Sequence, residues 1–251
     1  MTERSTGRRA RTGLPGWVLR AAAGTALAGG SWLALSRPLV QRGDVRVGDA
    51  VRRFSTPRLD SAIRHTTDLG SIYAVGGAAT ALAATGRRDA AKDVLGVGAA
   101  AWVLSQTNKR LVKRQRPYEA HGVRRLIRPP TGSSFPSGHA ACGMGIMAIA
   151  ADHARPGIGA TLLHSVGAYI AASRVYVGVH YPTDVIGGAG LGLLIAALWR
   201  GPVAVAGRGG IGAATRTGRR LAPTLLRAAA QAILGVELRR WHDDAPAPDA
   251  A

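Results

Sequence analysis

Six stretches of this 251-residue chain carry almost no charge, and basic residues fill the intervals between them. The stretches cover residues 14–36, 69–85, 94–107, 137–151, 158–173 and 185–199. None of them shows the polar face that a helix on the surface of a water-soluble bundle needs. Ala and Gly are frequent in them, and such small residues let helix backbones approach closely. The pattern predicts an all-α bundle of six packed helices.

The lengths of these stretches bear on whether the bundle lies in a membrane. Five of the six are shorter than the roughly 18 apolar residues that identify a membrane span by themselves. A soluble, Ala-rich helical bundle is therefore an alternative on periodicity alone. The missing polar face, and flanking side chains that can extend to the interface, favour an integral membrane bundle of about six transmembrane helices. In the first, Arg20 lies between Trp17 and Trp32, which favours a retained anchor over a cleaved signal peptide.

Charge and composition narrow the classes of function. Lys and Arg number 33 against 14 Asp and Glu, which gives a formal net charge of +19. Strongly basic chains often bind nucleic acid, but here the arginines flank apolar stretches instead of forming a stripe with stacking aromatics. The apolar share of 47% argues against disorder over most of the chain. The single cysteine, Cys142, excludes an internal disulfide and a Cys-rich metal site, and we expect it to serve packing.

The same pattern divides the chain into four parts. Residues 1–13 form a basic tail, and residues 14–68 hold the first transmembrane helix and a basic interfacial segment. Residues 69–200 form the core, and residues 201–251 form a basic C-terminal tail. In that tail Leu221, Leu225, Ile233 and Val236 fall near one helical face with arginines beside them, as in a helix lying on an anionic membrane. A solvated tail is the alternative.

Three clusters of polar residues lie at ends of the predicted helices. They read Lys109-x6-Arg116-Pro117, Pro136-Ser137-Gly138-His139 and Ser173-Arg174-x5-His180-x3-Asp184. A bundle would bring the three cations together, and Arg and Lys side chains both bind phosphate oxygens. Pro136 before Ser137 and Gly138 indicates a helix start, where free N–H groups favour an anion. The clusters together predict a phosphate cradle.

Two histidines fall beside this cradle, His139 in the first turn of its helix and His180 just before Pro182. Asp184 follows His180 by four residues, so its carboxylate can accept a hydrogen bond from one imidazole nitrogen and leave the other free to attack. One histidine as nucleophile and one as proton donor can cleave a phosphate ester without metal. Taken singly, each cluster also fits a cap, a surface loop or a contact with lipid headgroups. The three in this order favour the catalytic interpretation.

The segments KRLVKRQRP, PSGH and SRVYVGVHYPTD resemble the three-part signature of the type 2 phosphatidic acid phosphatase (PAP2) and vanadium haloperoxidase superfamily. The resemblance implies that His180 is the nucleophile and forms a phosphohistidine, and that Asp184 orients it. It implies that His139 protonates the leaving oxygen and later activates water. It implies neither metal nor cofactor. The residues expected to hold the phosphoryl oxygens are Lys109, Arg116, Ser137, Gly138 and Arg174.

The predicted function is that of a membrane phosphatase acting on a phosphate or diphosphate of a lipid, such as phosphatidic acid, phosphatidylglycerol phosphate or an isoprenyl diphosphate. The nearby Arg124, Arg125 and Arg128 could hold a second phosphate or contact headgroups. The alternatives are a vanadate-dependent haloperoxidase, whose relatives are typically larger and soluble, and a catalytically silent membrane relative. The expected partners are the lipid phosphate and membrane lipids, without nucleic acid, and the oligomeric state stays open.

The expected location is the plasma membrane, crossed several times. An N-terminus in the cytoplasm followed by six spans places both termini there, and the loops that carry the clusters share the outer face. The basic N-terminus and tail agree with the positive-inside rule, although arginines in residues 37–64 and 109–128 blur it. We therefore expect the active site at the helix ends on the extracytoplasmic face.

Overall fold

The computed structural model describes residues 15–203. The chain divides into one unit over Met1–Gly201 and another over Pro202–Ala251, so the described residues lie almost wholly in the first. The predicted basic tail over residues 1–13 and the predicted amphipathic helix with Leu221 and Val236 lie outside the described residues.

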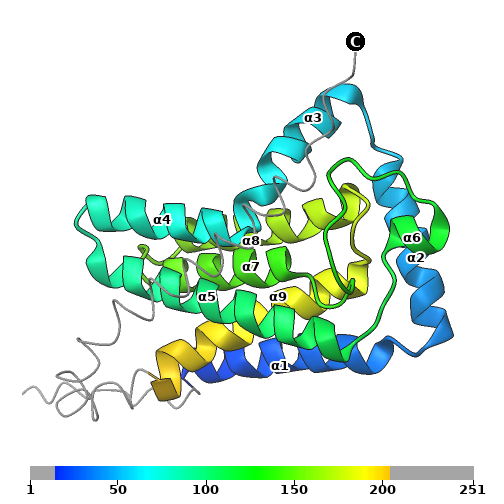
Figure 1. Ribbon diagram of the computed structural model, residues 1–251. Helices are drawn as coiled ribbons and strands as arrows, with labels where there is room; N and C mark the ends of the chain where they lie inside the picture. Colours follow the sequence, from blue (N-terminus) through cyan, green and yellow to red (C-terminus); the bar gives the residue numbers. More distant parts are fainter. Residues whose placement is uncertain (1–14, 204–251) are drawn as a thin grey trace, which may run out of the picture. The chain divides into compact units, whose positions relative to one another are not determined.

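Residues 15–203 fold into helices joined by loops, with no strand among them. All six predicted helices are present, which confirms the all-α class (Figure 1). Their bounds are α1 Gly16–Ala34, α4 Ile72–Ala84, α5 Arg88–Leu111, α7 Gly138–Ala151, α8 Ile158–Tyr176 and α9 Pro182–Leu198, and a π-helical turn, Trp199–Val203, follows α9.

The basic segment between the first two predicted spans folds as two helices and a short turn. These are α2 Pro38–Arg52, α3 Pro57–Thr66 and the 3-10 helix η1 Thr67–Gly70. A proline at the first position begins both α2 and α3, where its fixed φ suits a helix start. The Thr56 side chain also accepts from the Leu59 amide at 3.3 Å and caps α3. A fourth addition, α6 Pro117–His121, lies in the loop between α5 and α7.

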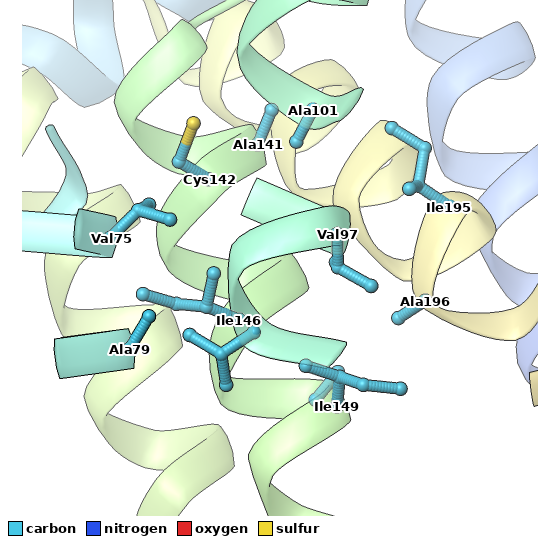
Figure 2. Close-up of a cluster of buried hydrophobic side chains, with 12 residues drawn as sticks. Val75, Ala79, Val97, Ala101, Ala141, Cys142, Ile146, Ile149, Ile195 and Ala196 are labelled. Atoms are coloured by element: carbon cyan, nitrogen blue, oxygen red, sulfur yellow. The ribbon is translucent and has the colours of Figure 1, made fainter. Parts of the chain in front are cut away.

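Helix α7 is the centre of the bundle and contacts α4, α5, α8, α9 and η1 (Figure 1). The main hydrophobic cluster joins α4, α5, α7 and α9 through small and branched side chains such as Val75, Val97, Ile146 and Ile195 (Figure 2). Cys142 is fully buried in this cluster, and its thiol lies 3.6 Å from the Gly98 carbonyl. It packs in the core, as predicted.

Helices α1 and α9 run against each other at backbone contact. A Cβ at Gly24 would lie 2.6 Å from the Leu194 amide nitrogen, and one at Gly190 would lie 2.5 Å from the Ala28 nitrogen. Contacts this short exclude any side chain at either glycine, so small residues set the spacing of the two helices as they do in membrane helix pairs.

A polar network joins helices at the end of the bundle where α1 and α5 begin and α7 and α9 end. Arg20 donates to both carboxylate oxygens of Asp152, at 2.8 and 2.6 Å. Asp93 accepts from Trp199 at 2.9 Å and lies 2.8 Å from His153. Arg20, expected to anchor α1 at an interface, therefore ties it to the end of α7.

The described residues do not confirm six membrane spans. By length and composition, one stretch, Pro182–Gly201, is long and apolar enough to cross a membrane. Gly16–Ala34 and Pro38–Arg52 would add a second only if this pair, bent by 106°, counted as one span. Helices α4 and α7 are apolar but have 13 and 14 residues, about 20 Å at 1.5 Å per residue.

Candidate active site

The eight predicted site residues come from four helix ends and two loops that meet at the end of the bundle opposite the Asp93 and Asp152 network. Lys109 lies in the last turn of α5, and Arg174 in the last turn of α8. Ser137, Gly138 and His139 begin α7, and Asp184 lies in the first turn of α9. Arg116 and His180 stand in the loops before α7 and before α9.

Electrostatic contacts show that these groups share one site. Lys109 interacts with Arg116, Arg174 and Asp184, and His139 interacts with both Lys109 and Arg174. Three cations thus surround the two predicted catalytic histidines, which is the charge that a phosphoryl group requires.

His180 is 2% exposed and presents a defined tautomer. Its Nε2 lies 3.3 Å from Nη1 of Arg116. Because a guanidinium only donates, Nε2 must accept and carries the lone pair, while the proton resides on Nδ1 and faces Asp184. Burial lowers the pKa of His180 to about 3, against the opposing effect of Asp184. The imidazole is therefore neutral at physiological pH, as a nucleophile must be.

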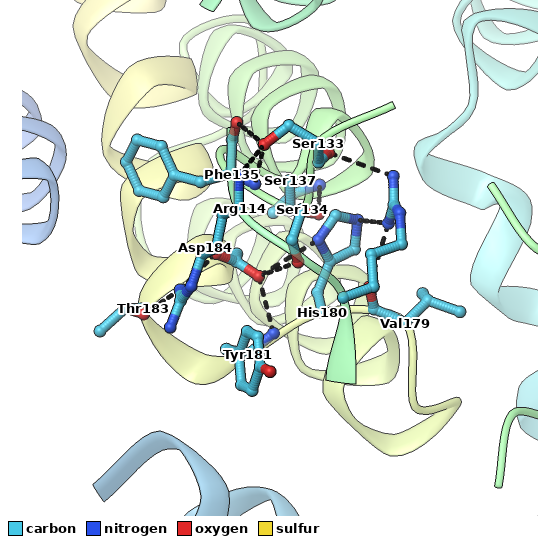
Figure 3. Close-up of polar contacts among 12 residues, drawn as sticks. Arg114, Ser133, Ser134, Phe135, Ser137, Val179, His180, Tyr181, Thr183 and Asp184 are labelled. Carbon is cyan, nitrogen blue, oxygen red and sulfur yellow. Dashed lines mark hydrogen bonds and ion pairs between the residues drawn. The ribbon is translucent and has the colours of Figure 1, made fainter. Parts of the chain in front are cut away.

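Asp184 is fixed on several sides (Figure 3). Its carboxylate accepts from the Ser134 hydroxyl at 2.5 Å, the Tyr181 amide at 2.8 Å and Arg114 at 2.6 Å. The predicted hydrogen bond from His180 needs correction, since Nδ1 and Oδ2 of Asp184 lie 3.5 Å apart without hydrogen-bond geometry. Asp184 orients the ring electrostatically at this distance, because its own oxygens are held by other donors.

Arg116 uses all of its donors within the protein. It is fully buried, and one N–H points to Nε2 of His180. Its other donors bind the carbonyls of Gly132 at 3.1 Å, Val179 at 3.0 Å, Thr131 at 3.3 Å and Ser133 at 3.2 Å. The residue that the sequence predicts as a phosphate ligand thus braces both loops of the site and aims the imidazole, with one N–H directed at the reacting nitrogen.

The start of α7 differs slightly from the expected one. The helix begins at Gly138 with Ser137 as its cap, and Pro136 precedes the cap. The Ser137 hydroxyl accepts from the Ala140 amide at 3.4 Å, and the Ser137 amide donates to the Asp184 carbonyl at 3.0 Å. This hydrogen bond fixes the start of α7 against the start of α9.

Arg174 and His139 both lie close to the carboxylate of Asp68, which was not predicted as a site residue. Arg174, 1% exposed, donates to the Thr67 hydroxyl at 2.8 Å, and its Nη1 lies 3.6 Å from Asp68. Nε2 of His139 lies 3.3 Å from the same carboxylate. Contact with His139, and then the charges of His139 and Arg174, hold the pKa of Asp68 below its usual range. Asp68 thus stays ionised beside the predicted proton donor.

Three buried side-chain nitrogens lack a hydrogen-bond partner among the described residues, and all three belong to the predicted site. They are Nε2 of His139, Nε of Arg174 and Nδ1 of His180. A buried polar group without a partner costs free energy, and such groups in folded proteins generally mark function or a bound species. Their clustering is what the predicted anion site with two histidines requires.

Two further side chains complete the site and were not predicted. Arg114 joins Asp184 to Asp44 of α2, which is itself buried. Arg114 lies inside the segment KRLVKRQRP, so its position beside Arg116 was an available signal. Asp44 shares one helical face with Gly48 and Val51 at i, i+4 and i+7, a weak signal that one inward-facing position of α2 is acidic.

Two of the three arginines suggested for a second phosphate or for headgroup contact have partners within the protein. Arg124 lies 3.7 Å from Asp60, and the guanidinium of Arg125 lies over the ring of Tyr118 at 5.6 Å. As to metals, residues 15–203 contain no group of three His, Cys, Asp or Glu side chains arranged to hold an ion.

Comparison with known proteins assigns the family. Residues 90–203 match the family model of the PAP2 superfamily. Residues 90–203 therefore form a PAP2-superfamily region. The match contains all three sequence clusters and begins within α5, so α2 with Asp44 and η1 with Asp68 lie outside it. No curated protein sequence matches this chain.

Two solved structures resemble the PAP2 fold seen here. One is described as the first transmembrane PAP2 type phosphatidylglycerolphosphate phosphatase from Bacillus subtilis; it is 24% identical, with a TM-score of 0.60, and the match covers 75% of this chain and 96% of that one. The other is LpxE from Aquifex aeolicus, 25% identical with a TM-score of 0.57, covering 62% of this chain and 93% of that one.

Proposed function

We propose that this protein is a membrane phosphatase that hydrolyses a phosphate monoester or diphosphate of a lipid through a phosphohistidine. The observation that carries the proposal is the set of unpartnered buried nitrogens on His139, Arg174 and His180, all at one site. Neutral His180, with its lone pair on Nε2, supports the role of nucleophile.

In the first step, Nε2 of His180 attacks phosphorus and the bond from phosphorus to the lipid oxygen breaks. His139 gives its proton to that leaving oxygen, so the lipid alcohol or lipid monophosphate leaves with this oxygen protonated. The imidazole of His180 becomes positively charged as the phosphorus–nitrogen bond forms, and Asp184 stabilises that charge from 3.5 Å.

In the second step, water attacks the phosphohistidine and the phosphorus–nitrogen bond breaks. His139, now deprotonated, accepts the proton of that water, which returns both histidines to their starting states and releases inorganic phosphate. Lys109, Arg174 and the amides that begin α7 would hold the equatorial oxygens, where charge grows in the transition state. Ser137 and Gly138 supply this helix start.

A membrane location is supported by the outward faces of the helices and by the similar proteins. Large apolar side chains stand exposed on α1, α5 and α8, among them Trp32, Val103, Leu104 and Leu162. Surfaces of this kind are covered by lipid or protein when a chain functions. We place the protein in the plasma membrane as a multi-pass bundle of about six spans, with its site on the extracytoplasmic face.

The substrate class follows from the cradle and the location. The site offers cations for one phosphoryl group, and a lipid tail can stay in the bilayer while its headgroup reaches the helix ends. The similar Bacillus subtilis protein is described as a phosphatidylglycerolphosphate phosphatase. Phosphatidylglycerol phosphate, phosphatidic acid and an isoprenyl diphosphate are the candidates that we propose to compare.

The test is phosphate release by the detergent-purified full chain on these three lipids, with a chelator present. His180→Ala should abolish release, whereas His153→Ala, the same change at the other end of the bundle, should leave it intact. Release that persists in His180→Ala overturns the phosphohistidine mechanism. If the folded wild type releases phosphate from none of the lipids, the proposed function is wrong, and vanadate-dependent halide oxidation would then identify a haloperoxidase.

A further inference from the structure

Asp44 is a buried carboxylate at the active site that comes from outside the region matching the family. It lies on α2, is 3% exposed, and precedes the matched region by 46 residues. Its Oδ1 accepts from the Thr183 amide at 2.9 Å, and its Oδ2 accepts from the Thr183 hydroxyl at 2.5 Å. Thr183 is the residue next to Asp184 at the start of α9, so α2 is bound to the turn that carries the catalytic carboxylate.

Arg114 connects the two carboxylates directly. Nη1 donates to Asp184 and Nη2 donates to Asp44, each at 2.6 Å. The guanidinium also lies 4.1 Å above the ring of Tyr181, which fixes its plane (Figure 3). The planar fork directs donors on two separate nitrogens at the two acids, whereas a lysine would have to reach both carboxylates from a single nitrogen.

The bridge also supplies negative charge beside His180, which the cations Arg116 and Lys109 face from the other elements. Asp44, Arg114 and Asp184 carry formal charges of −1, +1 and −1, which leaves one negative charge beside the imidazole. Without the Asp44 charge the three side chains would sum to zero, and the charge of Asp184, 3.5 Å from His180, would be opposed by an Arg114 that has no second carboxylate to balance it. A small cavity beside His180 is lined by Asp44 and Gly48, so α2 forms a wall of the site as well.

We propose that Asp44 is a positioning residue for catalysis: through Arg114 and Thr183 it fixes Asp184 and keeps the net negative charge directed at His180. This inference rests on the proposed phosphohistidine chemistry. It makes α2 part of the active site, although the three sequence clusters do not include it.

The test compares Asp44→Asn with Asp49→Asn in the detergent-purified full chain, using the best lipid substrate. Both are the same change on α2, but Asp49 is paired with Arg52 one turn away and, among residues 15–203, has no ion pair to the turn that carries Asp184. Asp44→Asn should lower kcat by about 10-fold to 100-fold, as displaced supporting groups do, with KM within about twofold because Asp44 is not expected to touch substrate. Asp49→Asn should leave both constants unchanged.

A second measurement separates positioning from a general loss of structure. Vanadate can bond to Nε2 of His180 as a five-coordinate anion, whereas inorganic phosphate relies on the surrounding cations. Asp44→Asn should therefore weaken inhibition by vanadate about tenfold and leave inhibition by phosphate unchanged. Asp44→Glu, which restores the charge, should recover part of both kcat and vanadate inhibition. Equal weakening of the two inhibitors would overturn the positioning role.

The outcomes distinguish this inference from the proposed function. An inactive, folded wild type overturns both. An active wild type in which Asp44→Asn behaves like Asp49→Asn overturns the role of Asp44 alone. If Asp44→Asn does not fold, Thr183→Val decides, because it removes one hydroxyl from the bridge and keeps the Asp44 charge. Its kcat should fall severalfold, and an unchanged kcat would refute the inference.

Discussion

Replacing Arg116 by lysine, and Arg174 by lysine in parallel, tests whether the two arginines have different roles. Arg116 and Arg174 were both expected to bind phosphate, but only Arg116 has every N–H engaged within the protein. Within residues 15–203, Arg174 donates one hydrogen bond, to Thr67 at 2.8 Å, and its Nε has no partner. The change to lysine keeps the charge in both cases and removes the guanidinium fork.

The expected loss of stability follows from the number of hydrogen-bond donors that each side chain offers. Arg116 serves four carbonyls and the His180 imidazole, whereas a lysine has three N–H donors on one atom. At least two buried or partly buried acceptors then lose their donor, at about 1–3 kcal/mol each, so Arg116→Lys should cost about 2–6 kcal/mol. Arg174→Lys can keep its bond to Thr67 and should cost about 1 kcal/mol.

The assay is thermal unfolding of both variants in one detergent, with phosphate release measured in parallel. For a domain of this size 1 kcal/mol shifts Tm by about 2–4 °C, so Arg116→Lys should melt about 4–24 °C below wild type and Arg174→Lys about 2–4 °C below it. Both should lose activity, Arg174→Lys without a matching loss of stability. A Tm for Arg116→Lys equal to or above that of Arg174→Lys would refute the assignment of its donors to the loops.

Three other predictions concern single contacts. A Cβ at Gly188 would collide with the backbone carbonyl of the α7 cap, so Gly188→Ala should destabilise the protein by about 1–3 kcal/mol in thermal unfolding, and a neutral result would mean that α7 and α9 separate freely. Asp68→Asn removes the charge 3.3 Å from His139 and should lower kcat severalfold with lipid substrate; an unchanged kcat would leave the carboxylate without a role. The pKa of Asp60 is held below its usual 3.8, first by the Tyr176 hydroxyl, so the carboxylate stabilises the fold above about pH 4 and that contribution is lost as pH falls through the lowered pKa. Tyr176→Phe should therefore reduce Tm at pH 7 and have less effect at pH 3, and a constant difference would contradict this sign.

Local signals determined most of the fold. The six apolar stretches all became helices, which pack against one another through small and branched apolar residues. Prolines fixed the starts of α2, α3 and α9. The number of membrane spans was beyond such signals, since helices of 13 and 14 residues fit a buried core as well as a bilayer.

For the site, too, some features were predictable from the sequence and others only from the tertiary structure. The sequence by itself predicted the candidate reacting groups, because His139, His180 and the cations stand close to helix ends that a bundle brings together. The tertiary structure decided what each group does with its hydrogen bonds. The sequence could not show that Arg116 braces two loops, nor that Asp44 lies beside Thr183, 139 residues along the chain. Such pairs are chosen when helices pack and buried charges must find partners, and that choice depends on the whole bundle.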